Sequence, residues 1–359
     1  MAMVRQERRK YAARVLSLPI WMMILCTSIR TTSSLSLPSS NTSPLSPSQI
    51  SSQVLANKRA VITGASGGIG AAIAQTLASH GADVLLHYHT RRDGAKDVCR
   101  SIRESGGTCR GIIQCDFRSP SAIDKMWNVI CSHDAIGWHS NDNSSHGEGE
   151  GEEGGIDILV NNAGIVTKLA AEDDDDSLSA WHETMAVNLH APLQLSLLAK
   201  PSLQNRSQTT NSRSTILNIS SIHGARSVEY MTAYAASKAA LDSLTRGLAL
   251  EYAPLGINVN GLAPGVVPVE RTQQLFDDVK VQDMWRPHLP VGRLGTVQDV
   301  AQTALLLCTS EWMTGTVLTI DGGSHARANM PFRPRPAKPS LEGDDGDDDC
   351  SGDVRFESL

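Results

Sequence analysis

The stretch Thr63-Gly64-Ala65-Ser66-Gly67-Gly68-Ile69-Gly70 decides the fold of this chain. It follows a short apolar run, 60–63, and opens an amphipathic run, 69–80. Glycines let a backbone turn tightly and approach a pyrophosphate closely, and the helix that follows presents unpaired amides and a partial positive charge. The position of this cluster between a first strand and a first helix predicts a dinucleotide-binding loop, with a merely structural turn as the alternative.

Outward from this loop, short apolar runs alternate with longer amphipathic runs as far as Gly323. We expect strands at 60–63, 83–87, 111–115, 156–160, 215–219, 257–260 and 317–320, and helices at 69–80, 93–105, 123–132, 177–200, 231–252 and 297–309. Strands that alternate with helices predict a parallel sheet covered on both faces. The expected fold is α/β: a single-domain, Rossmann-like, doubly wound parallel sheet of about seven strands, with its ligand site at the carboxyl ends of the strands.

The segments outside this pattern differ in composition. Residues 1–30 combine a basic start with an apolar run that is shorter than the roughly 20 residues of a spanning helix, so they resemble a signal peptide. Residues 31–52 are rich in Ser, Thr and Pro, which is typical of a transit segment or linker. We expect the nucleotide-binding domain over 53–325, exposed polar inserts at 133–155 and 204–213, and a disordered acidic tail over 326–359.

The two-part leader bears on localisation. A signal core followed by a hydroxyl-rich stretch resembles the leaders of proteins that are sent to plastids derived from secondary endosymbiosis. The ER or secretory lumen and a retained membrane anchor are the alternatives.

Composition excludes several classes of protein. The 359 residues are 40% hydrophobic and 19% charged, with a net charge of -6 and acidic blocks at 148–157, 173–176 and 342–353. Because no basic stripe with interleaved aromatics is present, we expect no nucleic acid as partner. The seven cysteines form no CxxC pair, so we expect no metal site. We expect buried reduced thiols rather than a disulfide set at Cys99, Cys109, Cys115, Cys131 and Cys308.

The end of the second expected strand bears on the type of cofactor. The run from His87 to Arg92 carries no carboxylate, whereas an NAD enzyme uses one there to bind the ribose hydroxyls. The planar fork of Arg91, with Arg92 beside it, suits a 2′-phosphate. The pattern favours NADP(H) over NAD(H), and a solvated helix start is the alternative interpretation of the two arginines.

Tyr234 and Lys238 are four residues apart on the expected helix 231–252, which puts them on one face. A nearby ammonium stabilises a phenolate and lowers the pKa of a tyrosine from its usual value near 10. Upstream, Ser221 and its neighbour Ser220 end an expected strand at the ligand edge, where a hydroxyl can bond a substrate carbonyl. Such a pair is common on ordinary helices, but together with the glycine loop it indicates a carbonyl reductase with Tyr234 as the proton donor.

Taken together, these motifs resemble the short-chain dehydrogenase/reductase family. The matching segments are TGASGGIG at 63–70, NNAG at 161–164, the strand end at Ser221 and YAASK at 234–238, in the order of the family and within 58–324. The resemblance implies that Tyr234 donates the proton, Lys238 lowers its pKa and Ser221 orients the carbonyl. It also implies that Asn188 anchors a water in a proton relay to Lys238.

The resemblance also implies contacts to the cofactor. In the glycine loop these are Thr63, Gly64, Ser66, Gly68, Ile69 and Gly70, with Arg91 beyond them. Asp116 would contact the adenine amino group, and the adenosine ribose would lie along Asn161, Ala163 and Gly164. Tyr234 and Lys238 would contact the nicotinamide half, together with Pro264, Gly265 and Val267. One departure is Val269, which stands where the family usually has a threonine that touches the cofactor. The segment 270–288 is expected to form a lid that selects the substrate, with packing against a neighbouring subunit as the alternative for its apolar residues, which are Leu275, Phe276, Met284 and Trp285.

Within the family, the chain looks most similar to 3-oxoacyl-[acyl-carrier-protein] reductases, including the GRLGT segment at 292–296. A plastid address would agree with a role in fatty-acid synthesis, and an acyl carrier protein is then an expected partner. However, Leu255 stands where those enzymes hold a basic residue, so Lys200 or Arg206 would have to supply the charge.

Two other functions stay open, since fold and motifs do not determine a substrate. One is a sugar, polyol or secondary-alcohol dehydrogenase of the same family, and the other is a non-catalytic, nucleotide-binding regulatory protein. The resemblance further implies a homotetramer that is assembled through the helices at 177–200 and 231–252.

Overall fold

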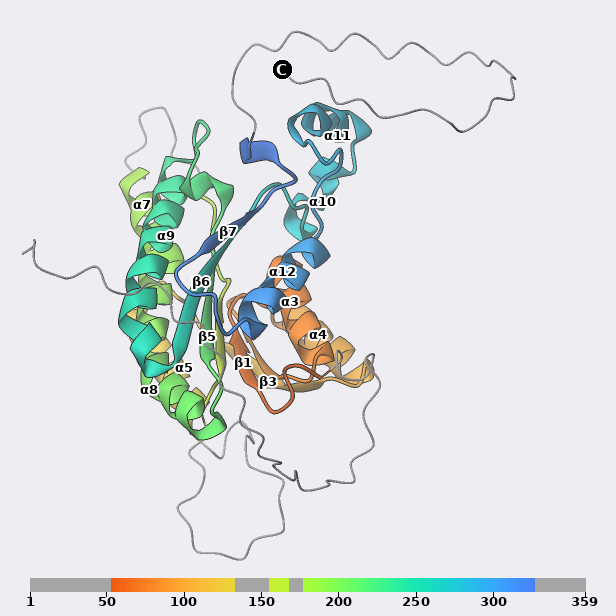
Figure 1. Cartoon of the computed structure of the whole chain (residues 1–359). Coiled ribbons are helices and arrows are strands. Elements are labelled where there is room, and N and C mark those ends of the chain that lie inside the picture. The colour runs from red at the N-terminus through yellow and green to blue at the C-terminus, as the bar shows by residue number, and fades with distance from the viewer. Residues whose placement is uncertain (1–52, 133–154, 168–176, 327–359) are drawn as a thin grey trace, which may run out of the picture. The chain divides into compact units, whose positions relative to one another are not determined.

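The computed structural model describes residues 53–132, 155–167 and 177–326 (Figure 1). The predicted leader, the transit segment, the insert predicted at 133–155 except its last residue, and the tail beyond residue 326 lie outside the described residues. In the part of the chain that the structure describes, no helix is long and apolar enough to cross a membrane.

Seven strands form one parallel sheet. They are β1 (Arg59–Ile62), β2 (Asp83–Tyr88), β3 (Thr108–Gln114), β4 (Ile158–Asn161), β5 (Ser214–Ile219), β6 (Ile257–Pro264) and β7 (Val317–Ile320). Their order across the sheet is β3-β2-β1-β4-β5-β6-β7, and every neighbouring pair is parallel. The path through the sheet starts at β1, proceeds through β2 to β3 at one edge and resumes at β4 on the other side of β1, so the topological switch point lies between β1 and β4. The predicted fold class is confirmed.

Helices cover both faces of the sheet (Figure 1). One face carries α3 (Gly68–Ser79), α4 (Arg92–Glu104) and α12 (Val297–Thr309), and the other carries α5 (Pro120–Cys131), α8 (Ala191–Thr210) and α9 (Thr232–Tyr252). Successive strand residues alternate between the two cores: Ile62 packs in the first, and Val61 in the second. Burial on both faces explains why the strands read as nearly continuous apolar runs.

The helix predicted at 177–200 is wrong in its end point and in its regularity. It consists of α7 (Ser177–Met185), a π-helical turn η1 (Ala186–His190) and α8, which continues to Thr210. The predicted exposed loop at 204–213 is therefore mostly helix. The last turns of α8 are stabilised by a contact that is distant in the sequence, because Arg206 pairs with the buried Asp157. The composition of residues 204–213 does not predict that contact.

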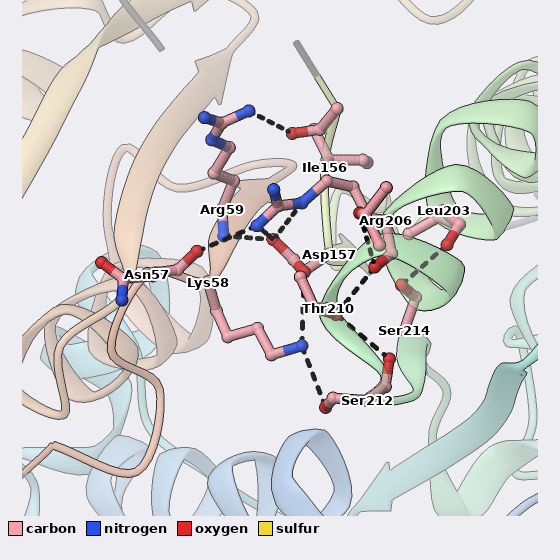
Figure 2. A network of polar contacts seen from close by, with 12 residues as sticks. Asn57, Lys58, Arg59, Ile156, Asp157, Leu203, Arg206, Thr210, Ser212 and Ser214 are labelled. Atoms are coloured by element: carbon pink, nitrogen blue, oxygen red, sulfur yellow. Dashed lines mark hydrogen bonds and ion pairs between the residues drawn. The ribbon is translucent and has the colours of Figure 1, made fainter. Parts of the chain in front are cut away.

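A buried polar network joins β1, β4 and α8 at the amino ends of the strands (Figure 2). The side chain of Asp157 is fully buried and accepts from Lys58 Nζ at 3.3 Å and from Arg59 N at 2.9 Å. Arg206 donates to the same carboxylate through Nε and Nη2, at 3.2 and 3.1 Å. The suggestion that Arg206 could hold an acyl carrier is therefore wrong, because its guanidinium is already bound within the fold.

Two cysteines depart from the prediction of reduced thiols. Cys99 on α4 and Cys109 on β3 form a disulfide, and their Cα atoms lie 5.5 Å apart. The turn through Gly106 lays α4 back along β3, which brings the two side chains within bridging distance. As predicted, Cys115 and Cys308 are buried and free, whereas the free Cys131 is exposed, because α5 presents it to solvent.

Candidate active site

The glycine loop connects β1 to α3 as predicted. Gly64 and Gly68 adopt φ angles of 64° and 56°, a left-handed region that glycine enters without steric cost. A Cβ atom on Gly64 would lie 2.8 Å from the Cα of Ala163, and one on Gly70 would lie 2.4 Å from Asn162 Nδ2. The loop can adopt this shape only because Gly64 and Gly70 have no side chains. Its position at the start of α3 fits the pyrophosphate of a dinucleotide.

The backbone of this loop is held from the NNAG segment. The hydroxyl of Thr63 donates to Val160 O at 3.1 Å and accepts from the amides of Asn162 and Ala163, both at 2.9 Å. Asn162 Nδ2 in turn donates to the carbonyls of Thr63 and Gly64, at 2.9 and 3.1 Å. Thr63 is 1% exposed, so its hydroxyl serves the loop itself. Sequence reasoning missed Asn162, although the motif that contains it was identified.

His87 ties the end of β2 to the same loop. Its ring is 1% exposed and stacks on Phe117, with ring centres 4.2 Å apart. Nδ1 accepts from the amide of Gly64 at 3.1 Å, so the proton lies on Nε2, which donates to Cys115 O at 3.1 Å. Burial lowers the pKa of His87 to about 4.

We expect acid to destabilise the fold through His87. The unfolded chain takes up a proton near pH 6.5, whereas the folded chain does so only near pH 4. Because the folded pKa lies below the unfolded pKa, the free energy of unfolding is undiminished above pH 6.5 and falls by about 3 kcal/mol as the pH drops through this window. Denaturant titrations on either side of the window measure the loss. His87→Asn should flatten it, and an equally steep loss in that variant would assign the effect to other groups.

The predicted contacts at the adenosine end are engaged with neighbouring charges. Arg91 precedes α4, and its Nη1 lies 4.0 Å from the Oε2 of Glu270. Asp116 accepts from Arg118 Nη2 at 2.7 Å, and this hydrogen-bonded guanidinium lowers the pKa of the carboxyl to about 2. His89 lies 3.6 Å from the same carboxylate. The contact of Asp116 with an adenine stays a prediction.

The predicted catalytic side chains come together where β5 ends and α9 begins. Ser221 follows β5, and its side chain is near enough to Tyr234 to oppose the rise in the pKa of the phenol. Ser221 Oγ also accepts from His223 N at 3.2 Å. Lys238 is 4% exposed; its Nζ donates to Ile219 O at 2.8 Å and lies 5.7 Å from the ring centre of Tyr234. The strand end and the first turns of α9 thus hold a hydroxyl, a phenol and an ammonium side by side.

Burial dominates the proton affinities of this group. It raises the pKa of Tyr234, and Ser221 and the positive charge of Arg271 oppose that rise. Burial also lowers the pKa of Lys238 to about 8, against the opposing charge of Asp242. Lys238 is not among the groups that oppose the rise in the pKa of Tyr234, so its expected effect on that pKa stays a prediction.

Asn188 lies in the π-helical turn η1 and is completely buried. Its Oδ1 accepts from Ile165 N at 2.9 Å, and its Nδ2 donates to Ile165 O at 2.9 Å and to Ser237 Oγ at 3.1 Å. Both amide hydrogens are used, so the side chain clamps the segment after NNAG. A Cβ atom on Gly164 would lie 3.3 Å from Asn188 Oδ1 and 3.6 Å from Lys238 Nζ. A water of the predicted proton relay would therefore have to bind a backbone group of η1 instead of the Asn188 side chain. Single π-helical turns of this kind recur at functional sites.

Sequence reasoning missed a carboxylate beside Lys238, that of Asp242. Asp242 lies one turn after Lys238 on α9 and is 9% exposed. Its Oδ1 has no hydrogen-bond partner among the described residues. Burial raises the pKa of Asp242, against the opposing effects of Ser220, Arg246 and Lys238. The sequence feature that could have identified Asp242 was its spacing of four residues from Lys238, which places both on one helix face.

The remaining predicted cofactor residues lie along the same edge. Asn161 Nδ2 donates to Asn218 Oδ1 at 2.9 Å, so it supports the sheet between β4 and β5. Pro264 ends β6, and a Cβ atom on Gly265 would lie 2.6 Å from Asp321 Cβ. Val267 packs against the core beside them. Across the described ranges, no group of three or more His, Cys, Asp or Glu side chains forms a metal site.

The predicted lid consists of α10 (Glu270–Phe276), α11 (Val279–Trp285) and the turn η4 (Arg286–His288). Phe276 is buried and contacts Trp285, with ring centres 6.3 Å apart, whereas Leu275 and Met284 are 57% and 68% exposed. Only part of the expected apolar cover therefore faces inward. A cavity of about 450 Å³ lies between the lid and the GRLGT segment. None of the predicted catalytic residues lines this cavity.

A glycine cradle at the switch point of a parallel sheet, with Ser221, Tyr234 and Lys238 at the strand ends, defines an oxidoreductase that uses a nicotinamide dinucleotide. Residues 58–134 match the family model for short chain dehydrogenases, and residues 147–325 match one described as enoyl-(acyl carrier protein) reductase. The chain belongs to the short-chain dehydrogenase/reductase family, whose NAD(P)-dependent members act on CH–OH groups.

Individual relatives differ in substrate. The 3beta-hydroxysteroid dehydrogenase 1 of Eggerthella lenta is 32% identical over 271 residues, which cover 75% of this chain and 94% of the relative. The 3-oxoacyl-[acyl-carrier-protein] reductase of Aquifex aeolicus is 32% identical over 272 residues, which cover 75% of this chain and 98% of the relative. Their names thus include both a steroid enzyme and an acyl-carrier enzyme.

Two solved structures differ in cofactor. A gluconate 5-dehydrogenase from Burkholderia cenocepacia, in complex with NADP and tartrate, is similar with a TM-score of 0.64 and 28% identity, covering 78% of this chain and 100% of that one. A 7α-hydroxysteroid dehydrogenase complexed with NADH and 7-oxo glycochenodeoxycholic acid has a TM-score of 0.64 and 29% identity, covering 77% and 96%.

Proposed function

We propose that the protein is an NADPH-dependent carbonyl reductase that converts 3-oxoacyl thioesters of acyl carrier protein to 3-hydroxyacyl thioesters. The observation that carries the reaction type is the joint placement of Ser221, Tyr234 and Lys238 beside the glycine loop. The GRLGT segment, the acyl-carrier description of one matching family model and the Aquifex relative support the substrate.

Each side chain of this site has a separate role in such a reduction. The bound dinucleotide supplies the hydride. Ser221 donates a hydrogen bond to the substrate carbonyl, and Tyr234 delivers a proton to the same oxygen. Lys238, with its pKa of about 8, is mostly charged at neutral pH, and its ammonium stabilises the phenolate that proton transfer leaves behind.

Arg91 supports the choice of NADPH. A Cβ atom on Gly67 would lie 3.0 Å from Arg91 Nη1, so the guanidinium reaches the glycine loop from the end of β2. An arginine fork at this place suits a 2′-phosphate. The gluconate 5-dehydrogenase structure holds NADP, although the steroid dehydrogenase structure holds NADH.

A sugar or polyol dehydrogenase is the second candidate, and the gluconate 5-dehydrogenase similarity favours it. The complete set of Ser221, Tyr234 and Lys238 argues against a non-catalytic nucleotide-binding protein. We further propose a homotetramer, because Leu197 on α8 and Leu250 on α9 are 55% and 80% exposed. A plastid location is proposed from the two-part leader alone.

A substrate panel tests this proposal. The full chain is assayed with NADPH and with NADH against an acetoacetyl thioester of acyl carrier protein, its coenzyme A counterpart and gluconate-type sugars in the oxidative direction. We expect thioester reduction, faster with NADPH than with NADH. Turnover of the sugars without turnover of any thioester would replace the proposed substrate by the second candidate.

A further inference from the structure

The first residue of the lid reaches into the glycine loop. Oε1 of Glu270 accepts from Gly68 N at 2.9 Å, and Oε2 lies 4.0 Å from Arg91 Nη1. A Cβ atom on Gly67 would lie 2.6 Å from Glu270 Oε1. The carboxylate thus lies over the open backbone of the loop, between the first amide of α3 and the arginine.

The two groups that face the Glu270 carboxylate, the amide of Gly68 in the loop and the guanidinium of Arg91 at the start of α4, would attract any anion bound there. Gly68 is the first residue of α3, a helix of 12 residues, and its amide is one of those left unpaired within the helix. The N-cap residue Gly67 has no side chain, and the first turn of α3 contains no acidic residue. The helix start therefore lacks a local anion, and a carboxylate that arrives from 202 residues away along the chain compensates its partial positive charge.

The start of the lid is built to hold this carboxylate in place. Val269 N donates to Thr272 Oγ1 at 3.0 Å, and Thr272 N donates to Val269 O at 2.8 Å, so the first turn of α10 is closed. A Cβ atom on Gly68 would lie 3.1 Å from Val269 Cγ1. Val269 and Glu270 together cover the loop.

We propose that Glu270 is an internal competitor for the cofactor: its carboxylate occupies the anion site of the glycine loop, and a dinucleotide pyrophosphate binds only after displacing it. Two anions on one amide repel each other, so cofactor affinity is lowered by the free energy of the Glu270 contact. Displacement also releases α10, whose Arg271 carries the positive charge that acts on Tyr234. This inference rests on the proposed dinucleotide dependence of the site.

Equilibrium binding of NADPH and NADH to the full chain, without substrate, tests the inference through nicotinamide fluorescence. Glu270→Gln keeps the shape of the side chain and removes its charge, so the Kd for both dinucleotides should fall roughly tenfold. Asp277→Asn is the matched control: it removes one charge from the same lid, but its carboxylate accepts from Gln273, and the Kd should not change. Because Glu270 and Arg91 are 54% and 56% exposed, added salt should reduce the difference between Glu270→Gln and the unmodified chain.

The outcomes separate the inference from the proposed function. Unchanged or weaker binding in Glu270→Gln would overturn the inference, as would equal tightening in Asp277→Asn, which would show an effect of net charge. Tightening confined to NADPH would also overturn it, since the pyrophosphate is common to both dinucleotides. If the unmodified chain and both variants bind neither dinucleotide, the proposed function itself fails.

Discussion

Replacing Tyr234 with phenylalanine should lower kcat about 10³-fold, because the variant lacks the hydroxyl that protonates the carbonyl oxygen. The ring keeps its place, since its edge-on contact with His223, at 6.0 Å between centres, needs no hydroxyl. The Kd for NADPH should therefore stay near that of the unmodified chain. Steady-state rates with the best substrate of the panel, measured beside binary cofactor binding, separate the chemical step from binding.

Tyr230 provides the control for this prediction. It lies four residues upstream, is 54% exposed and sits outside the hydrogen-bonded group around Lys238. Tyr230→Phe should leave kcat and cofactor binding unchanged. Equal rates for Tyr234→Phe and the unmodified chain would refute the role of Tyr234 as proton donor.

Replacing Asp157 with alanine should lower the free energy of unfolding by about 3 kcal/mol, because it leaves two cations of one network without their shared carboxylate. Asp157 is fully buried, and the side chains of Lys58 and Arg206 are only 16% and 11% exposed. Urea titration measures the loss. The specific activity of the folded fraction should be unchanged, since the network lies at the amino ends of the strands (Figure 2).

An exposed pair is the control for this network. Asp97 contacts Arg100 at 2.9 Å, and both side chains are 64% exposed, so solvent screens their attraction. Asp97→Ala should shift the urea midpoint very little. If Asp157→Ala were no more destabilising than Asp97→Ala, the network at the base of β1 and β4 would contribute nothing net to the fold.

Local patterns in the sequence were sufficient for the fold class and for most of the predicted catalytic group. Glycines at Gly64 and Gly68 mark a backbone that needs positive φ angles, and apolar runs mark strands that are buried on both faces. The spacing of Tyr234 and Lys238 places them on one helix face. Each of these signals acts over a few residues, so it can be read without knowing what packs against it.

The tertiary structure alone decided the features that depend on distant partners. Arg206 holds the end of α8 through Asp157, 49 residues away, and Glu270 reaches the glycine loop across 202 residues. The pKa of Tyr234 follows from desolvation, which residue spacing does not encode. Packing of the whole chain decides which charges come together and how far water is excluded from them. Each of these contacts joins segments that are far apart in the sequence, so neither local sequence predicts its partner.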